Sequence, residues 1–212
     1  MEILLIFSCE NLRNSSVIGE ATCAVTVSKE QRPFIILSGL PGSGKSTLGR
    51  KLATAFDLPF IDKDDVLEEL FESEGIGDSE WHNRMSRKSD VIFQERASES
   101  DGAVLVSWWH LTGMQPESGT PTDWLPVLSN RLVRVHCDCD PVISSGRFFE
   151  RIRHPGHLDA MSSYSDFVAG GQRLALLGTI DVGIGLTVDT SKKLNLDALV
   201  GDVRNALGSN RR

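Results

Sequence analysis

The sequence predicts an α/β fold in which a parallel sheet is covered by helices on both faces. Short apolar runs, typical of strands that are buried on both sides, alternate from Pro33 onward with longer segments of helical periodicity. Such alternation is the pattern of repeated strand–helix–strand units. The chain has 212 residues, of which 40% are hydrophobic and 24% charged. This length and composition are ordinary for one globular domain with a large core.

Five strands are predicted from the apolar runs, at 34–37, 60–61, 103–106, 132–136 and 184–188. Helical spacing of apolar residues predicts helices over 46–56, from the acidic cluster at 62–65 through Leu70, and over 80–100, 144–153, 166–177 and 195–207. Every predicted strand except the third is followed closely by a predicted helix, as a parallel sheet requires.

Residues 1–31 do not share this pattern, because Asn11, Asn14, Ser15 and Ser16 interrupt their apolar residues. We therefore divide the chain into an N-terminal extension, 1–31, and a domain, 32–212. The extension could add an edge strand to the sheet, form an irregular tail, or result from a start site upstream of the natural one.

The charge balance and the cysteines exclude several classes of protein. Lys and Arg number 22 and Asp and Glu 29, so the net charge of −7 argues against a general binder of nucleic acid or membrane surfaces. No apolar run approaches the roughly 20 residues of a membrane-spanning helix. Cys9, Cys23, Cys137 and Cys139 fit neither a disulfide scaffold nor a zinc site, and Glu2 stands where a signal peptide carries positive charge. We expect a cytoplasmic protein with reduced thiols.

The most specific motif is a glycine-rich phosphate loop at 39–46. The segment Gly39-Leu40-Pro41-Gly42-Ser43-Gly44-Lys45-Ser46 matches G-x-x-x-x-G-K-S/T at every fixed position, between a predicted strand and a predicted helix. In such a loop backbone N–H groups surround a polyphosphate, Lys45 reaches the β- and γ-phosphates, and the Ser46 hydroxyl is a ligand for Mg²⁺. The residues expected to contact the nucleotide are Gly39, Pro41, Gly42, Ser43, Gly44, Lys45, Ser46 and Thr47.

The phosphate loop, followed by Asp62 and Asp64 after the second strand, resembles the small P-loop kinases of metabolites and antibiotics. Gluconate kinase, shikimate kinase and chloramphenicol phosphotransferase are such enzymes. The resemblance covers about 33–207, and the tract at 153–159 is most similar to a group of bacterial predicted kinases. It implies a three-layer P-loop NTPase fold, a parallel sheet of order 2-3-1-4-5, and a mobile lid at about 147–160. It also implies ATP and Mg²⁺ as cofactors, and a hydroxyl group of a small molecule as the acceptor.

In the sheet that the resemblance implies, Asp62 and Asp64 stand beside the phosphate loop. A kinase needs a carboxylate that orients the acceptor hydroxyl and accepts its proton, and oxygens around Mg²⁺. Asp62 suits the metal shell with Ser46, and Asp64 matches the acceptor-binding base of the similar kinases. The alternative is that both only cap the next helix, which is how we interpret Asp65.

The third predicted strand ends at Ser107, where many P-loop enzymes have a metal-shell Asp. Ser107 could act there only through water, which places more weight on Asp62. Trp108 and Trp109 follow, before a long loop at 112–121 that is rich in Gly, Pro, Ser and Thr. Each tryptophan either forms a wall of the acceptor pocket or belongs to the core.

A basic segment supplies the lid that the resemblance implies. Arg147 and Arg151 are four residues apart on one predicted helix face, and the similar kinases use such a pair on ATP and its γ-phosphate. Arg153 is a further candidate. His154 and His157 flank Pro155-Gly156 and are interpreted as surface-loop residues, with contact to acceptor or phosphate as the alternative. The adenine ring is expected near 189–191.

These observations predict an ATP- and Mg²⁺-dependent phosphotransferase in which Lys45, Asp64, Arg147 and Arg151 carry catalysis. Its acceptor is a small hydroxylated molecule. Nine acids between 62 and 80 argue against a polynucleotide acceptor. Two alternatives stay open: a kinase of a nucleotide sugar or polynucleotide end, and a non-catalytic ATP-binding regulatory module.

Overall fold

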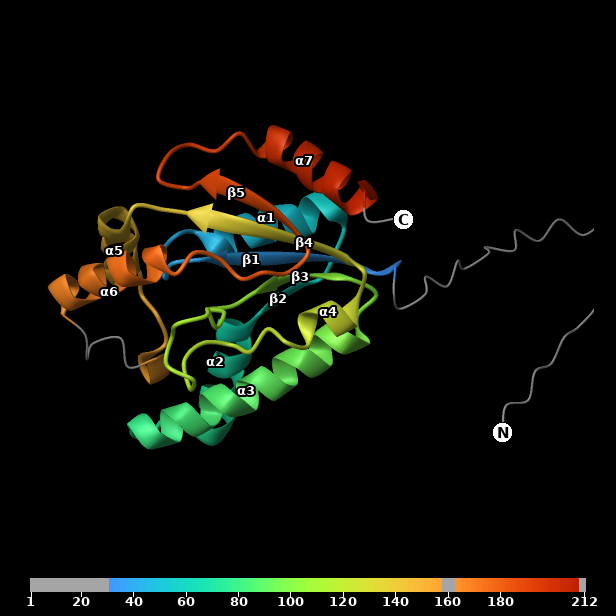
Figure 1. The fold of residues 1–212 in the computed structure, drawn as a ribbon. Coiled ribbons are helices and arrows are strands. Elements are labelled where there is room, and N and C mark those ends of the chain that lie inside the picture. The colour runs from blue at the N-terminus through green and yellow to red at the C-terminus, as the bar shows by residue number, and fades with distance from the viewer. Residues whose placement is uncertain (1–30, 158–162, 210–212) are drawn as a thin grey trace, which may run out of the picture.

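The computed structural model describes residues 31–157 and 163–209 (Figure 1). Within these residues five strands form one parallel sheet of order β2-β3-β1-β4-β5, which confirms the predicted fold class and strand order. The strands are β1 (Pro33–Gly39), β2 (Phe60–Asp62), β3 (Ala103–Val106), β4 (Arg131–Asp138) and β5 (Ile184–Asp189). Residues 1–30 of the predicted extension and 158–160 of the predicted lid lie outside the described residues.

The long helices agree with the predicted ones except near the lid, and the short α4 was not predicted. The helices are α1 (Lys45–Phe56), α2 (Lys63–Glu74), α3 (Ser79–Glu99), the short α4 (Leu125–Leu128), α5 (Pro141–Glu150), α6 (Tyr164–Leu176) and α7 (Leu196–Ser209), with a 3-10 turn at Pro155–His157. Helix α5 was expected over 144–153 and lies about three residues earlier. The reason is local. Asp140 caps helix α5 by accepting hydrogen bonds from the N–H groups of Val142 and Ile143, and Pro141 stands in the first turn of the helix.

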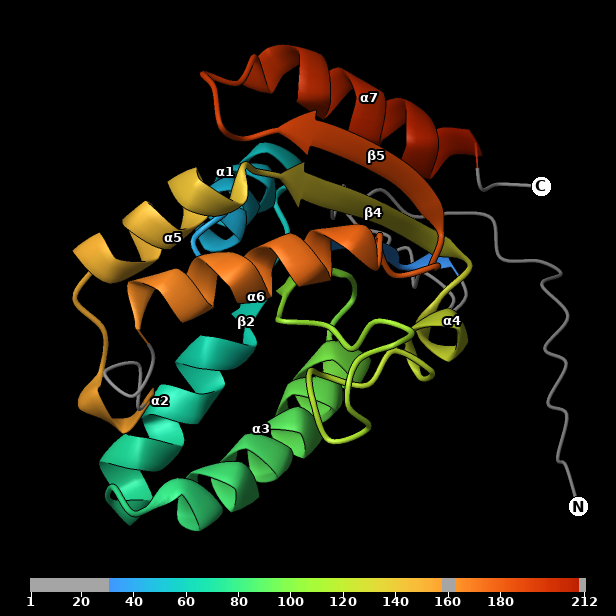
Figure 2. The same ribbon diagram turned by 60° about the vertical axis from the view of Figure 1, so that its left-hand side comes forward.

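Alternate side chains of β1 build the two halves of the core. Ile35 and Leu37 pack with α1 and α7 on one face of the sheet, whereas Phe34 and Ile36 pack with α3 and α4 on the other. All four are fully buried, as expected for the central strand of a parallel sheet. The chain is therefore layered as helices, sheet and helices (Figures 1 and 2).

Helices α5 and α6 lie side by side at the carboxyl end of the sheet (Figure 2). The rings of Phe148 and Phe167 stack between them, with centroids 4.1 Å apart. Helix α5 also contacts the phosphate loop, since a Cβ atom at Gly42 would overlap the Ser144 carbonyl group. The α5–α6 pair therefore forms one wall above the phosphate loop.

Two smaller findings concern the described residues alone. None of the helices within 31–157 and 163–209 has both the length and the apolarity that crossing a membrane requires. Cys137 and Cys139 are buried free thiols, while Cys9 and Cys23 lie outside the described residues.

Candidate active site

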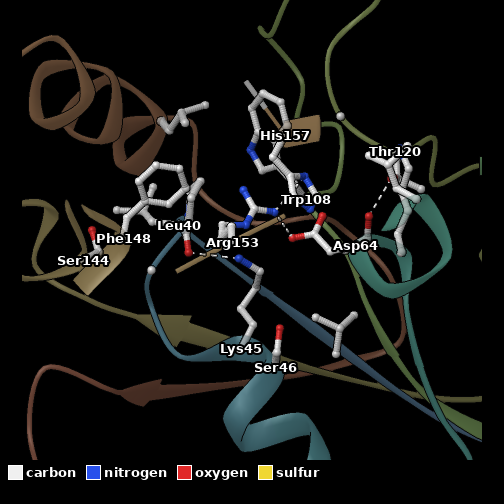
Figure 3. A pocket seen from close by; sticks show the side chains of 18 of the residues that line it. Leu40, Lys45, Ser46, Asp64, Trp108, Thr120, Ser144, Phe148, Arg153 and His157 are labelled. Atoms are coloured by element: carbon white, nitrogen blue, oxygen red, sulfur yellow. Dashed lines mark hydrogen bonds and ion pairs between the residues drawn. The ribbon is translucent and has the colours of Figure 1, made fainter. Parts of the chain in front are cut away.

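The carboxyl ends of β1, β2 and β3 open into a cavity of about 720 Å³ (Figure 3). The phosphate loop and the first turn of α1 form one side of it. The other walls come from α2, α3, the segment after β3, and the α5–α6 pair. Open parallel sheets bind ligands at this edge, and the volume lies within the usual range for ligand pockets.

The phosphate loop has the backbone that such a cradle needs. Gly42 and Gly44 have φ angles of 80° and 91°, in the left-handed region that glycine adopts without strain. Gly44 begins α1 and no side chain caps this end of the helix, so its first N–H groups can bind an anion. The predicted nucleotide-binding residues that line the cavity are Pro41, Gly42, Gly44, Lys45, Ser46 and Thr47. Gly39 and Ser43 do not line it.

Lys45 lies along the inside of this loop. Its Nζ donates to the carbonyl oxygens of Gly39 at 3.0 Å and Leu40 at 2.9 Å (Figure 3). Burial lowers the pKa of the Lys45 ammonium group, and the Asp64 and Asp62 carboxylates oppose that shift. The two hydrogen bonds therefore hold the ammonium group against the phosphate loop itself.

Ser46 and Asp62, the two predicted metal-shell residues, are in direct contact. The Ser46 Oγ donates to Asp62 Oδ2 at 2.6 Å. Burial, and next the nearby Asp64 carboxylate, raise the pKa of Asp62 to about 6. A hydroxyl and a carboxylate oxygen at this separation are the hard ligands that Mg²⁺ prefers, so the donor set fits this ion. Within the described ranges no group of three or more His, Cys, Asp or Glu side chains is arranged to hold a metal.

Asp62 caps the helix that follows β2. The interpretation of Asp65 as a cap is wrong. Asp62 Oδ1 accepts from the backbone N–H of Asp64 at 3.1 Å and begins α2. Asp65 instead forms an exposed ion pair with Arg50 at 3.0 Å. Asp62 therefore uses one oxygen for the helix and the other for Ser46.

The residues after β3 divide between the cavity and the core. Ser107 Oγ bonds to the Thr120 hydroxyl at 2.6 Å, which joins the end of β3 to the loop at 112–121. Trp108 lines the cavity and is 44% exposed. Trp109 is buried, and its Nε1 donates to the Leu37 carbonyl at 2.7 Å. Of the two tryptophans, Trp108 is thus the pocket residue and Trp109 belongs to the core.

Arg147 and Arg151 both line the cavity, but the prediction that they share a helix face is wrong. Helix α5 ends at Glu150, and Arg151 has extended backbone. Its guanidinium group lies 4.8 Å from the centroid of the Phe148 ring. Arg147 donates to the Thr190 carbonyl at 2.9 Å, next to the segment where the adenine ring is expected.

The arginine that pairs with Asp64 is neither Arg147 nor Arg151 but Arg153, which the sequence offered only as a further candidate. Arg153 Nη2 lies 2.5 Å from Asp64 Oδ2 (Figure 3), and His157 lies beside Arg153. Burial acts to raise the pKa of Asp64, but the positive charges of Arg153 and Lys45 outweigh it, so the net shift is downward. The Asp64 carboxylate is half-exposed and lines the cavity, where it can accept a proton. The side chain of His157 is only 5% exposed, contrary to its interpretation as a surface residue.

A second cluster of charges was missed from the sequence. Lys63 Nζ pairs with Asp90 Oδ1 at 2.6 Å, and both side chains are buried. Arg87 also bonds to Asp90, and to the Glu117 and Gly119 carbonyls of the loop after β3. One signal was available: Asp90 stands three residues before Phe93, on the face of α3 that also carries the buried Met85 and Ala97. This cluster joins α2, α3 and the loop into the far wall of the cavity.

Comparison with known proteins gives a matching family model and similar solved structures. The model described as an AAA domain matches residues 34–107. A "putative kinase" from Chloroflexus aurantiacus is similar over 83% of this chain and 98% of its own, with a TM-score of 0.68 and 24% identity. Shikimate kinase from Bacteroides thetaiotaomicron covers the same shares, with a TM-score of 0.53 and 17% identity. These likenesses establish the fold.

Curated relatives are similar over shorter stretches. Shikimate kinase from Corynebacterium glutamicum is 37% identical over 73 residues, 34% of this chain. Shikimate kinase from Paracidovorax citrulli is 66% identical over 35 residues, 16% of this chain. The matches span 43% and 19% of the relatives' own lengths. The resemblance to P-loop small-molecule kinases is thereby confirmed.

Proposed function

We propose that this protein transfers the γ-phosphate of ATP, in the presence of Mg²⁺, to a hydroxyl group of a small molecule. One observation carries the proposal. Lys45, the Ser46–Asp62 pair and Asp64 come from two segments of the chain, 45–46 and 62–64, and line one cavity at the end of the sheet. Binding of ATP alone would not require Asp64 or its arginine partner. The shikimate kinase relatives support a hydroxylated acceptor.

In the proposed reaction the nucleotide lies along the phosphate loop, with its γ-phosphate directed toward Asp64. Asp64 accepts a hydrogen bond from the acceptor hydroxyl and takes its proton as the new O–P bond forms. The bond from the γ-phosphorus to the leaving oxygen of ADP breaks in the same displacement. Lys45 and Arg151 neutralise the negative charge that spreads over the phosphoryl group, and Arg147 holds the nucleotide.

Ser46 and Asp62 are the residues that would hold Mg²⁺. When bound, the ion supplies charge neutralisation between the β- and γ-phosphates. Asp62 must be ionised for this role. Because its pKa is raised to about 6, the site is prepared for the ion at neutral pH and less so in acid.

The test is Mg·ATP-dependent release of ADP across a panel of acceptors. The panel contains shikimate, sugar acids, amino sugars, antibiotics, nucleosides, nucleotide sugars and oligonucleotides with a 5′-hydroxyl end. We expect at least one small acceptor to stimulate ADP release. Asp64→Asn should lower that stimulated rate about 10²-fold, because an amide cannot accept the proton, while ADP binding measured by calorimetry stays unchanged.

The outcomes separate the alternatives. Stimulation by oligonucleotides or nucleotide sugars alone would replace the small acceptor with those substrates. Tight ATP binding with no stimulated turnover would favour a regulatory module. Full activity of Asp64→Asn in a working assay would remove Asp64 from the proposed mechanism.

A further inference from the structure

The segment from Arg153 to His157 is packed against α2 by an aromatic contact. The His154 ring stacks on Phe71 with centroids 5.2 Å apart, and the His157 ring meets Phe71 edge-on at 5.4 Å. A Cβ atom at Gly156 would overlap the Phe71 ring, so glycine permits this close approach. The His82 ring of α3 lies against Phe71 as well. The segment is thus held next to the acceptor side of the cavity.

Two side chains of this segment and two of α2 form a continuous hydrogen-bonded chain. Glu68 Oε1 lies 2.7 Å from His157 Nε2. The other ring nitrogen, Nδ1, lies 3.1 Å from Arg153 Nη2, and that same Nη2 contacts Asp64 Oδ2 at 2.5 Å. The chain therefore runs from Glu68 through His157 and Arg153 to Asp64.

The donors and acceptors of this chain are fixed by chemistry. A guanidinium nitrogen only donates, so His157 Nδ1 must accept from Arg153. A ring that accepts at Nδ1 carries its proton on Nε2, and it donates that proton to the Glu68 carboxylate. The two hydrogens of Nη2 are then both used, one toward His157 and one toward Asp64. A doubly protonated ring would place two donors against each other.

Burial makes the arrangement rigid. The side chain of His157 is 5% exposed and that of Arg153 is 16% exposed, so water competes little for their hydrogen bonds. Arg153 is also confined from the other side, because its guanidinium group lies 5.7 Å from the centroid of the Phe148 ring on α5. The guanidinium group of Arg153, which a long flexible side chain carries, is thereby held in one position.

We infer that Glu68 and His157 are positioning residues that hold Arg153 on Asp64, so that one carboxylate oxygen is engaged and the other faces the acceptor hydroxyl. Arg153 occupies Oδ2, which leaves Oδ1 to accept the acceptor's hydrogen bond. The catalytic consequence rests on the proposed kinase function, whereas the hydrogen-bonded chain does not. Neither Glu68 nor His157 needs to touch a substrate.

The first experiment reads the tautomer of His157 by ¹⁵N NMR on protein labelled at histidine, near neutral pH. We expect the proton on Nε2 and an unprotonated Nδ1. Arg153→Met keeps an apolar stem but removes the donor that faces Nδ1, so a proton on Nδ1 is no longer opposed and the ring should no longer be held to one tautomer. A proton on Nδ1 in the unsubstituted protein would overturn the inference, whatever the enzyme's activity.

The second experiment compares three variants in the ADP-release assay. His157→Ala should lower kcat about tenfold with little change in the KM for ATP, because the reacting carboxylate and not the nucleotide is disturbed. His157→Asn should recover most of this loss, since its amide oxygen can accept from Arg153 in place of Nδ1. His154→Ala is the matched control: it also loses a ring packed on Phe71, but not a member of the chain.

A purely structural role for His157 predicts a different pattern. The His157→Ala, His157→Asn and His154→Ala proteins would then lose thermal stability together and keep similar kcat values, which would overturn the inference. Failure of the kinase proposal shows itself elsewhere, in the absence of acceptor-stimulated turnover by the unsubstituted protein. In that case the NMR result alone decides whether the chain exists.

Discussion

The two ends of the cavity are built from contacts of very different sequence separation. At the phosphate end, Lys45 bonds to carbonyl groups five and six residues away. At the acceptor end, Arg153 reaches Asp64 and His157 reaches Glu68, each across 89 residues. One strand–loop–helix unit therefore forms the phosphate end almost alone. The acceptor end exists only once α2, α3 and the segment after α5 have packed together.

The largest effect is expected at the phosphate end. Lys45→Ala removes the cation nearest the predicted γ-phosphate and should lower kcat about 10³-fold, the usual cost of losing one preorganised charge donor. The substitution also removes the two hydrogen bonds from Lys45 to loop carbonyl groups, so a small fall in the melting temperature is expected. The measurements are thermal unfolding and the release of ADP with an acceptor from the panel that stimulates turnover. Lys51→Ala, an exposed lysine on the same helix, should behave like the unsubstituted protein; equal losses in the two variants would contradict a specific role for Lys45.

The next effect is a loss of stability at the acceptor end. Asp90→Leu leaves the Lys63 ammonium buried without its carboxylate and should lower the free energy of unfolding by about 3 kcal/mol. Denaturation by urea measures this loss. The double variant Lys63→Met with Asp90→Leu replaces both charges by apolar groups and should regain most of the stability. If the double variant is as unstable as Asp90→Leu, the cost comes from packing and not from the unpaired charge.

This contrast also explains how much the sequence alone could predict. The strand order follows from the resemblance to P-loop kinases, whereas the phosphate loop and the Ser46–Asp62 pair follow from local motifs and from the sheet edge at which they stand. The pairing of Arg153 with Asp64 could not be predicted in this way, because it depends on where α5 ends. The predicted helix lay about three residues too late, so that Arg151 was expected on the same helix face as Arg147 and Arg153 was only a further candidate. His157 was misjudged for a related reason, since its burial is created by Phe71 on a distant helix.

Asp62 lies between the two ends and gives a pH-dependent prediction. Its pKa is about 6 in the folded protein, against about 3.9 in an unfolded chain, so the folded state holds the proton more tightly. The free energy of unfolding contributed by Asp62 is thus highest below about pH 4 and falls as the pH rises to about 6. Asp62→Asn keeps a good helix cap and removes this loss. In Mg²⁺-free buffer the variant should be about 3 kcal/mol more stable than the unsubstituted protein near pH 7.5, and equally stable near pH 4.

Urea unfolding at several pH values measures the difference between the two proteins. A constant difference across this range would mean that Asp62 does not titrate there. The same substitution should weaken the stabilisation of the protein by Mg·ADP, because Asp62 is one of the two proposed ligands. Greater stability without the ion and less stabilisation with it would together show that the carboxylate is kept for binding and not for folding.

The smallest effect concerns Arg147, the exception to the contrast between the two ends. This arginine lies at the phosphate end but donates to the Thr190 carbonyl, 43 residues away. Because it is exposed and joins α5 to the loop after β5, Arg147→Ala should raise the KM for ATP about fivefold and leave kcat within about twofold. Arg173→Ala, an exposed arginine on α6 that does not line the cavity, should change neither value. A large fall in kcat would instead place Arg147 on the transferred phosphate, as the resemblance implies. The phosphate end would then depend on long-range packing as the acceptor end does, because an arginine on α5 can reach that phosphate only when the α5–α6 pair is seated on the loop.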